Sequence, residues 1–101
     1  MTVLMTAVSM VKNDRIQDAI DGGKTSVEQL KAAGGKNVRQ FLAMNSTPIR
    51  LIVVFEAADQ AELGKITDTY LSNPEVQKTM GESLGENGYI AGYTSETIIE
   101  V

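Results

Sequence analysis

Four side chains of the sequence are of a type that could hold or orient a small molecule: Gln40, Tyr70, Tyr89 and Tyr93. Gln40 falls on the apolar face of a predicted strand, where a buried amide without partners costs about 1–3 kcal/mol unless it faces a ligand. A tyrosine phenol can orient a substrate or act as a proton donor and acceptor. More commonly, neighbouring groups satisfy such an amide, and a tyrosine packs its ring and points its hydroxyl to water. The four residues are the candidate ligand-binding residues, and no catalytic residue is assigned.

The sequence lacks both Cys and His, and their absence restricts the chemistry further. The 101 residues include no Cys, which excludes a disulfide, a thiolate nucleophile and a thiolate metal site. They include no His, which excludes the usual serine triad, an imidazole proton shuttle and a histidine haem ligand. An all-oxygen metal site would need an acidic cluster like a calcium loop, and the sequence has none. We therefore expect neither a metal nor a cofactor.

Charge and hydropathy argue against two classes of partner. Nine Lys and Arg against 13 Asp and Glu give a net charge of −4, and the basic residues are scattered rather than arranged in the stripe typical of nucleic-acid binders. The opening segment MTVLMTAVSMV is apolar, but it is too short to span a bilayer and no basic residue precedes it. We interpret it as a strand, expect neither nucleic acid nor membrane as a partner, and take the cytoplasm as the compartment.

The first helix is predicted from an apolar stripe at helical spacing. Asn13 or Asp14 can cap its start, and Gly34-Gly35 can end it. The segment DGGK at 21–24 interrupts it with two glycines, each of which costs up to about 1 kcal/mol relative to Ala. A capping box at Thr25 offers an alternative, in which a second helix begins there. The stripe stays in phase through the glycines, which favours one helix.

The remaining elements follow from alternating and helical patterns. Two strands joined by a turn are expected at 37–45 and 49–56, two helices begin after Asp59 and Asn73, and a last strand covers 89–101. Asp59 is followed three residues later by a glutamate, and Asn73 is followed by a proline, which are start signals for helices.

The register of the two middle strands decides which side chains share a face. A turn with an even number of residues gives the better separation of polar and apolar side chains. One face then carries Val38, Gln40, Leu42, Met44, Ile49, Leu51, Val53 and Phe55. The other face carries Arg39, Phe41, Ala43, Arg50, Ile52, Val54 and Glu56.

The order strand, helix, strand, strand, helix, strand predicts an α+β fold of ferredoxin-like βαββαβ type. Residues 1–101 would form a single domain, a four-stranded antiparallel sheet with helices on one face. The open face would keep Phe41, Ile52 and Val54, more apolar surface than a monomer normally exposes. A second copy packed sheet against sheet would cover it, so we expect a homodimer that forms an α/β barrel. An ion-pair network of Arg39, Arg50 and Glu56 would then lie inside the barrel.

Three passages resemble the dimeric α/β-barrel superfamily: AAGGKNVRQF, IRLIVVFEAADQAEL and YLSNPEVQKTMGE. This superfamily includes the antibiotic-biosynthesis monooxygenase, stress-responsive barrel, NIPSNAP and muconolactone-isomerase types. The resemblance covers essentially the whole chain and carries no catalytic motif. It implies that the short helix opened by Asn73-Pro74 roofs a cavity between sheet and helices, where ligand-binding members hold their ligands. The missing His and Trp weaken the resemblance to the haem-degrading and haem-peroxidase branches.

Three functions are consistent with this fold. The first is binding of an apolar or aromatic small molecule, as a cofactor-independent monooxygenase, an isomerase or a plain carrier. The second is a non-enzymatic structural or stress-linked interaction protein. The third is a regulatory domain that binds a small effector at the dimer interface. The sequence leaves open whether the protein is an enzyme, and the character of the cavity separates the first function from the second.

Overall fold

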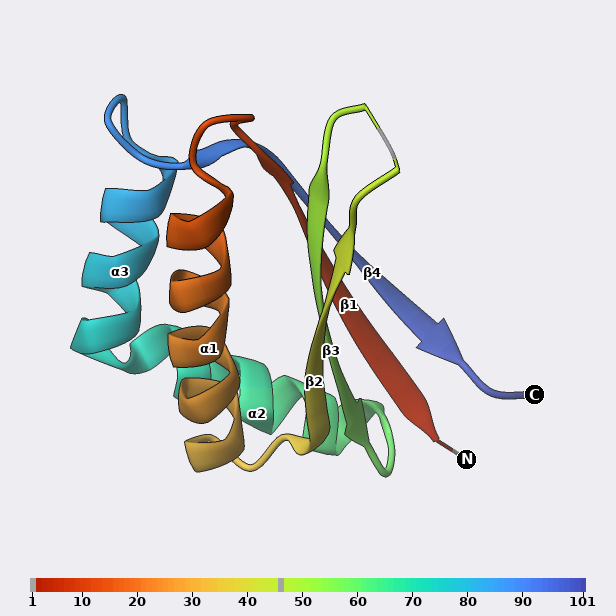
Figure 1. Cartoon of the computed structure of the whole chain (residues 1–101). Helices are drawn as coiled ribbons and strands as arrows, with labels where there is room; N and C mark the ends of the chain where they lie inside the picture. Colours follow the sequence, from red (N-terminus) through yellow and green to blue (C-terminus); the bar gives the residue numbers. More distant parts are fainter. Residues whose placement is uncertain (1, 46) are drawn as a thin grey trace.

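The computed structural model describes residues 2–45 and 47–101 and has a ferredoxin-like α+β fold (Figure 1). Its elements in chain order are β1 (Val3–Val11), α1 (Ile16–Ala32), β2 (Lys36–Ala43), β3 (Arg50–Ala57), α2 (Gln60–Ser72), α3 (Pro74–Leu84) and β4 (Ile90–Ile99). The four strands form one antiparallel sheet in the order β2-β3-β1-β4, and the helices lie on one of its faces. The predicted fold class is confirmed. Within the described part of the chain, no helix is long and apolar enough to cross a membrane.

The predicted register of β2 and β3 is also confirmed. Gln40 is opposite Val53, and Phe41 is opposite Ile52. Because side chains alternate along a strand, this pairing directs Val53 toward the helices and Phe41 and Ile52 toward the open face. Val53 is buried, whereas Phe41 is 50% exposed. The open face therefore carries large apolar side chains in the isolated chain, as expected.

The start of α1 differs from the prediction, because neither Asn13 nor Asp14 caps it. The backbone N–H of Arg15 donates to the carbonyl of Lys12 at 2.9 Å, so these residues form a turn before the helix. Arg15 occupies the N-cap position and makes no side-chain capping bond; its guanidinium instead pairs with Asp18 in the first turn. A cap depends on which backbone N–H groups the side chain can reach, and the turn places both candidates outside that position.

The predicted starts of the two later helices are confirmed. Asp59 accepts a hydrogen bond from the backbone N–H of Glu62 at 2.8 Å, and the Glu62 side chain accepts one from the N–H of Ala58 at 3.1 Å. Asn73 accepts a hydrogen bond from the N–H of Glu75 at 2.9 Å, with Pro74 at the first helical position. These bonds satisfy N–H groups that would otherwise lack partners, and they fix where α2 and α3 begin.

The two glycines of α1 do not interrupt the helix, so the alternative helix beginning at Thr25 is not formed. They allow close packing instead. A Cβ placed on Gly23 would lie 2.0 Å from Oε1 of Gln40 and 2.9 Å from Cδ2 of Leu51. A Cβ on Gly22 would lie 1.9 Å from the hydroxyl oxygen of Tyr89. Both positions are too crowded for any other residue without movement of these neighbours.

The hydrophobic core lies between the sheet and the helices in two clusters. The larger cluster joins α1, β2, β3 and α2 through Leu30, Val38, Val53, Phe55, Ala57 and Ile66. The smaller cluster joins β1, α1 and β3 through Val11, Ala19 and Leu51. The space between sheet and helices toward β4 and α3 is less completely filled, and the candidate site lies there.

We expect Gly23→Ala to lower the free energy of unfolding by about 1–3 kcal/mol, because the new methyl group overpacks the contact with Gln40 and Leu51. Gly64→Ala is the matched control. Gly64 also lies within a helix, but a Cβ there would have nothing within 4 Å, so alanine should stabilise the protein by up to about 1 kcal/mol. Urea unfolding of the two variants measures the difference. Equal stabilisation of the two variants would show that a methyl group at position 23 fits beside Gln40 and Leu51 without overpacking.

Candidate functional site

A cavity of about 370 Å³ lies between the sheet and the helices. Side chains of β1, β3 and β4 form its floor, and α1, α2 and α3 form its walls and roof. Leu71, Leu84 and Tyr93 line it and are each nearly half exposed, so they mark the place where it opens to solvent. The short helix α3 therefore roofs a cavity, as the resemblance implies. The volume falls in the lower part of the range typical of small-molecule sites.

The lining of this cavity is apolar and hydroxylic. Among the described residues no charged side chain lines it. Its polar residues all carry hydroxyl groups: Ser9, Ser26, Thr67, Tyr70, Thr79, Ser83, Tyr89, Tyr93 and Ser95. A charged ligand would lose its hydration here without gaining an opposite charge, whereas an uncharged ligand would lose far less. The lining therefore favours an uncharged molecule with few polar atoms.

The structure brings the three predicted tyrosines into this one cavity. Tyr70 comes from α2, Tyr89 from the segment just before β4, and Tyr93 from β4 itself. Tyr70 also packs against the larger core cluster, and Tyr89 packs against the smaller one. Two parts of the chain that are separate in sequence, α2 and the start of β4 with the residue before it, thus supply three phenol groups to a single site.

Gln40 lies behind the wall of the cavity and does not line it. Its Oε1 atom is buried and accepts no hydrogen bond from any described residue. The amide lies against Gly23 of α1, and Gly23 does line the cavity. The structure therefore separates Gln40 from the three tyrosines by one layer of backbone. An unpaired buried oxygen of this kind carries a desolvation cost of about 1–3 kcal/mol.

Burial raises the pKa of two of the tyrosines. The pKa of Tyr89 is raised mainly by burial, and interaction with the Ser83 side chain offsets part of this effect. Burial likewise raises the pKa of Tyr93, with a further contribution from the nearby Tyr70. An ordinary tyrosine is already protonated at neutral pH, so a raised pKa keeps these phenols uncharged. They can donate hydrogen bonds to a ligand, and they are poor general bases.

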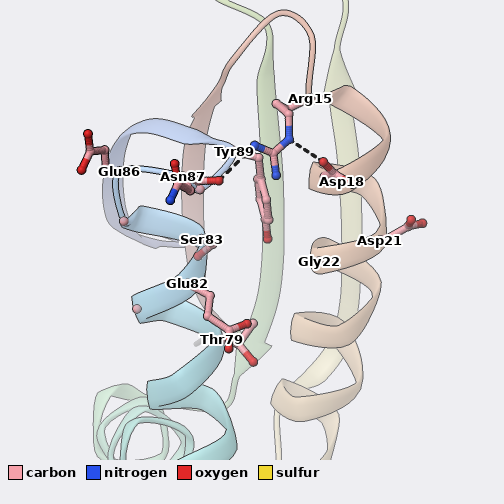
Figure 2. A pocket seen from close by; sticks show the side chains of 13 residues that line it. Arg15, Asp18, Asp21, Gly22, Thr79, Glu82, Ser83, Glu86, Asn87 and Tyr89 are labelled. Atoms are coloured by element: carbon pink, nitrogen blue, oxygen red, sulfur yellow. Dashed lines mark hydrogen bonds and ion pairs between the residues drawn. The ribbon is translucent and has the colours of Figure 1, made fainter.

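A second, wider cavity lies on the outer surface. This outer groove has a volume of about 640 Å³ and runs between α1, α3 and the loop at 85–88 (Figure 2). Its carboxylates are Asp18, Asp21, Glu82 and Glu86. No local pattern in the sequence predicts this groove, because its two sides are more than 50 residues apart and the acidic residues form no run.

Two basic side chains fasten the loop that precedes Tyr89. The guanidinium of Arg15 donates to the carbonyl of Asn87 at 3.0 Å, and the ammonium of Lys12 donates to the carbonyl of Glu86 at 3.2 Å. The backbone N–H of Lys12 donates to the carbonyl of Tyr89 at 3.0 Å. These bonds join the loop to the corner between β1 and α1, and so they fix the position of the Tyr89 backbone.

The charged residues of the open face are partly paired within the chain. Arg39 and Glu56 form an ion pair at 3.7 Å, and Asn37 donates to the same carboxylate at 2.5 Å. The guanidinium of Arg39 also lies 5.8 Å from the ring centre of Phe41. This pair neutralises two of the three charges expected on that face, which lowers the cost of covering it.

Comparison with solved structures identifies the same fold in several proteins. No protein-family model matches the chain, and no curated protein matches it. A NIPSNAP-like domain protein from Burkholderia xenovorans superposes with a TM-score of 0.81 at 7% identity, covering 99% of this chain and 85% of that one. A NIPSNAP family protein from Agrobacterium tumefaciens gives a TM-score of 0.78 at 10% identity, with 96% and 86% covered. An antibiotic biosynthesis monooxygenase gives 0.74 at 13% identity, with 98% of both chains covered.

The chain shares its fold with these proteins. At identities of 7–13% the likeness concerns the fold alone. The expected resemblance to the NIPSNAP and antibiotic-biosynthesis monooxygenase types is thereby confirmed at the level of fold.

We expect the stability of the protein to fall as the pH rises above about 10, where an unfolded tyrosine ionises but Tyr89 and Tyr93 still hold their protons. The folded state then binds more protons than the unfolded state, so unfolding is favoured by a rise in pH. The double variant Tyr89→Phe/Tyr93→Phe should lose less stability than the wild type between about pH 8 and pH 11. Urea midpoints at both pH values measure this. The same alkaline loss in both proteins would contradict the raised pKa values.

Proposed function

We propose that the protein binds a compact, uncharged apolar or aromatic molecule in the cavity beneath α2 and α3. The observation that carries this proposal is the cavity itself, about 370 Å³ in volume and lined by three tyrosines without any charged side chain among the described residues. The apolar lining would supply most of the binding free energy. Neutral phenol and hydroxyl groups would orient a ligand oxygen by donating hydrogen bonds.

The same fold supports a second candidate, catalysis without a cofactor. The likeness to an antibiotic biosynthesis monooxygenase favours an oxygenase, and an isomerase is the alternative that the sequence resemblance implies. The chain has no His or Cys, so acid–base chemistry would depend on the tyrosines. The raised pKa values of Tyr89 and Tyr93 keep these two phenols protonated, so at neutral pH they are weak acids that donate hydrogen bonds and do not abstract protons. Binding, with or without catalysis, is therefore the function that the site supports best. The alternative is a structural or stress-linked interaction protein in which the cavity has no ligand.

We further propose that the working form is a homodimer joined through the open face of the sheet. The centre of that face is apolar, because Ile52 lies between Val8 on β1 and Phe41 on β2. Phe41 is half exposed in the single chain, and Ile98 of β4 is 43% exposed on the same face. A second copy presents the same apolar face, as a two-fold symmetric interface requires. The internal ion pair of Arg39 with Glu56 neutralises two charges on this face, and Arg50 and Glu96 lie on it as well.

Ligand binding can be tested by filling the cavity. Thr67 lines it, so Thr67→Phe should weaken binding of a neutral fluorescent probe such as N-phenyl-1-naphthylamine by more than about tenfold. Thr69 lies two residues along the same helix and is exposed, so Thr69→Phe is the matched control and should leave binding unchanged. Fluorescence titration measures both. Undisturbed binding to Thr67→Phe would place the probe elsewhere, and no binding to the wild type would favour the structural alternative.

Assembly can be tested on the open face. Ile52→Asp places a charge at the centre of the proposed interface and should convert the dimer to monomer, because a buried carboxylate without a partner costs several kcal/mol. Thr47→Asp changes an exposed residue in the turn and should leave the dimer intact. Sedimentation at micromolar concentration distinguishes the two states. A monomeric wild-type protein would refute the dimer, and equal effects of the two variants would refute the interface.

A further inference from the structure

The ring of Tyr89 lies at the boundary between the inner cavity and the outer groove. Tyr89 lines both, together with Thr79 and Ser83 of α3. On α1 the boundary falls between two consecutive residues, since Gly22 lines the groove and Gly23 lines the cavity. Figure 2 shows the ring of Tyr89 in the gap between α1 and α3, opposite Gly22. The ring therefore forms a wall between two spaces of different character.

The position of this ring is determined at both ends. At the backbone, Lys12 donates a hydrogen bond to the carbonyl of Tyr89. At the far end, a Cβ on Gly22 would lie 1.9 Å from the hydroxyl oxygen and 2.7 Å from the ring carbon that bears it. The hydroxyl end thus rests directly against the backbone of α1, in space that any other residue at position 22 would occupy. Because residue 22 is a glycine, the Tyr89 ring can lie across the gap between α1 and α3.

We propose that Tyr89 is the end wall of the ligand site and sets the maximum length of the molecule that the cavity accepts. This inference rests on the proposed ligand-binding function. An apolar chain that enters past Leu71, Leu84 and Tyr93 stops at the Tyr89 ring. Without that ring the cavity is continuous with the outer groove, and a longer chain is buried along more of its length.

The outer groove behind Tyr89 and the cavity in front of it differ in charge. The preference for a charged ligand end therefore reports independently whether the Tyr89 ring has been removed. The described residues that line the groove carry four carboxylates and one guanidinium, and that guanidinium, from Arg15, is already paired with Asp18. The cavity in front of the wall is lined by no charged side chain of the described chain. A cationic group at the far end of a chain would therefore be favoured only after the wall is gone.

The test measures affinity against chain length with the full-length protein. Straight-chain primary alcohols of increasing length compete with N-phenyl-1-naphthylamine, and each buried methylene should tighten binding roughly fourfold until the chain reaches the wall. Beyond that length the affinity of the wild type should level off. Tyr89→Ala should move this levelling to chains longer by several methylenes, and the milder Tyr89→Leu should give an intermediate shift.

Tyr93→Ala is the matched control, because it removes the same ring from the mouth of the same cavity, and Tyr93 does not line the outer groove. It is expected to weaken the binding of every alcohol, but not to increase the chain length at which the affinity levels off. For chains longer than the wild-type limit, Tyr89→Ala should bind a molecule with a terminal ammonium about fivefold more tightly than the same chain with a terminal hydroxyl. Tyr93→Ala should not bind the ammonium more tightly.

Two results would overturn the proposal in different ways. An unchanged levelling length in both Tyr89 variants, or an equal shift in Tyr93→Ala, would show that Tyr89 is not the end wall while the cavity remains a binding site. Failure of the dye and of every alcohol to bind the wild type would refute ligand binding itself, and the end wall with it.

Discussion

The close approach of α1 to its neighbours, made possible by Gly22 and Gly23, is the constraint on which the rest of the site depends. Gly23 lets the helix lie against Gln40 and Leu51, so α1 is held near β2 and β3. Gly22 leaves room for the Tyr89 ring, so the gap between α1 and α3 is closed. Two residues that weaken the helix by up to about 1 kcal/mol each thereby position both its sheet contact and one end of the cavity. Glycine at these two positions is explained, despite its cost to the helix, by the close packing that any side chain there would prevent.

The cavity exists because the helices pack closely on the sheet near β2 and β3 but leave space near β4. The larger core cluster fills the space between α1, β2, β3 and α2, while the middle of β4 directs Tyr93, Ser95 and Thr97 to the inner face, between Ile90 and Ile99 at its two ends. Serine and threonine side chains fill less volume than Leu or Ile, so this stretch of β4 leaves space that larger aliphatic side chains would fill. The unfilled space and its uncharged polar lining are therefore two consequences of the same choice of residues.

Much of this arrangement follows from local patterns in the sequence. Alternation predicted the register of β2 and β3, and the caps at Asp59 and Asn73 predicted the two later helices, because both signals depend on residues close in sequence. The α1 start was predicted wrongly, because Asn13 and Asp14 lie in a turn before the helix and neither side chain caps it. Gln40 was assigned correctly to the inner face, but the face alone does not say whether α1 or the cavity lies opposite. The outer groove depends on α1 meeting the loop at 85–88, a contact that leaves no local pattern.

The two faces of the sheet are not independent. Each middle strand directs alternate residues to the cavity and to the open face, so Val53 and Ile52 belong to the same short length of backbone. A partner packed on the open face would restrict the twist of β1 and β3, and these strands carry Met5, Ala7 and Phe55 on the floor of the cavity. Assembly would then narrow the range of cavity shapes without contributing a single atom to its lining. In this protein the stiffness of the ligand site would come from the dimer, and its length and polarity from the chain itself.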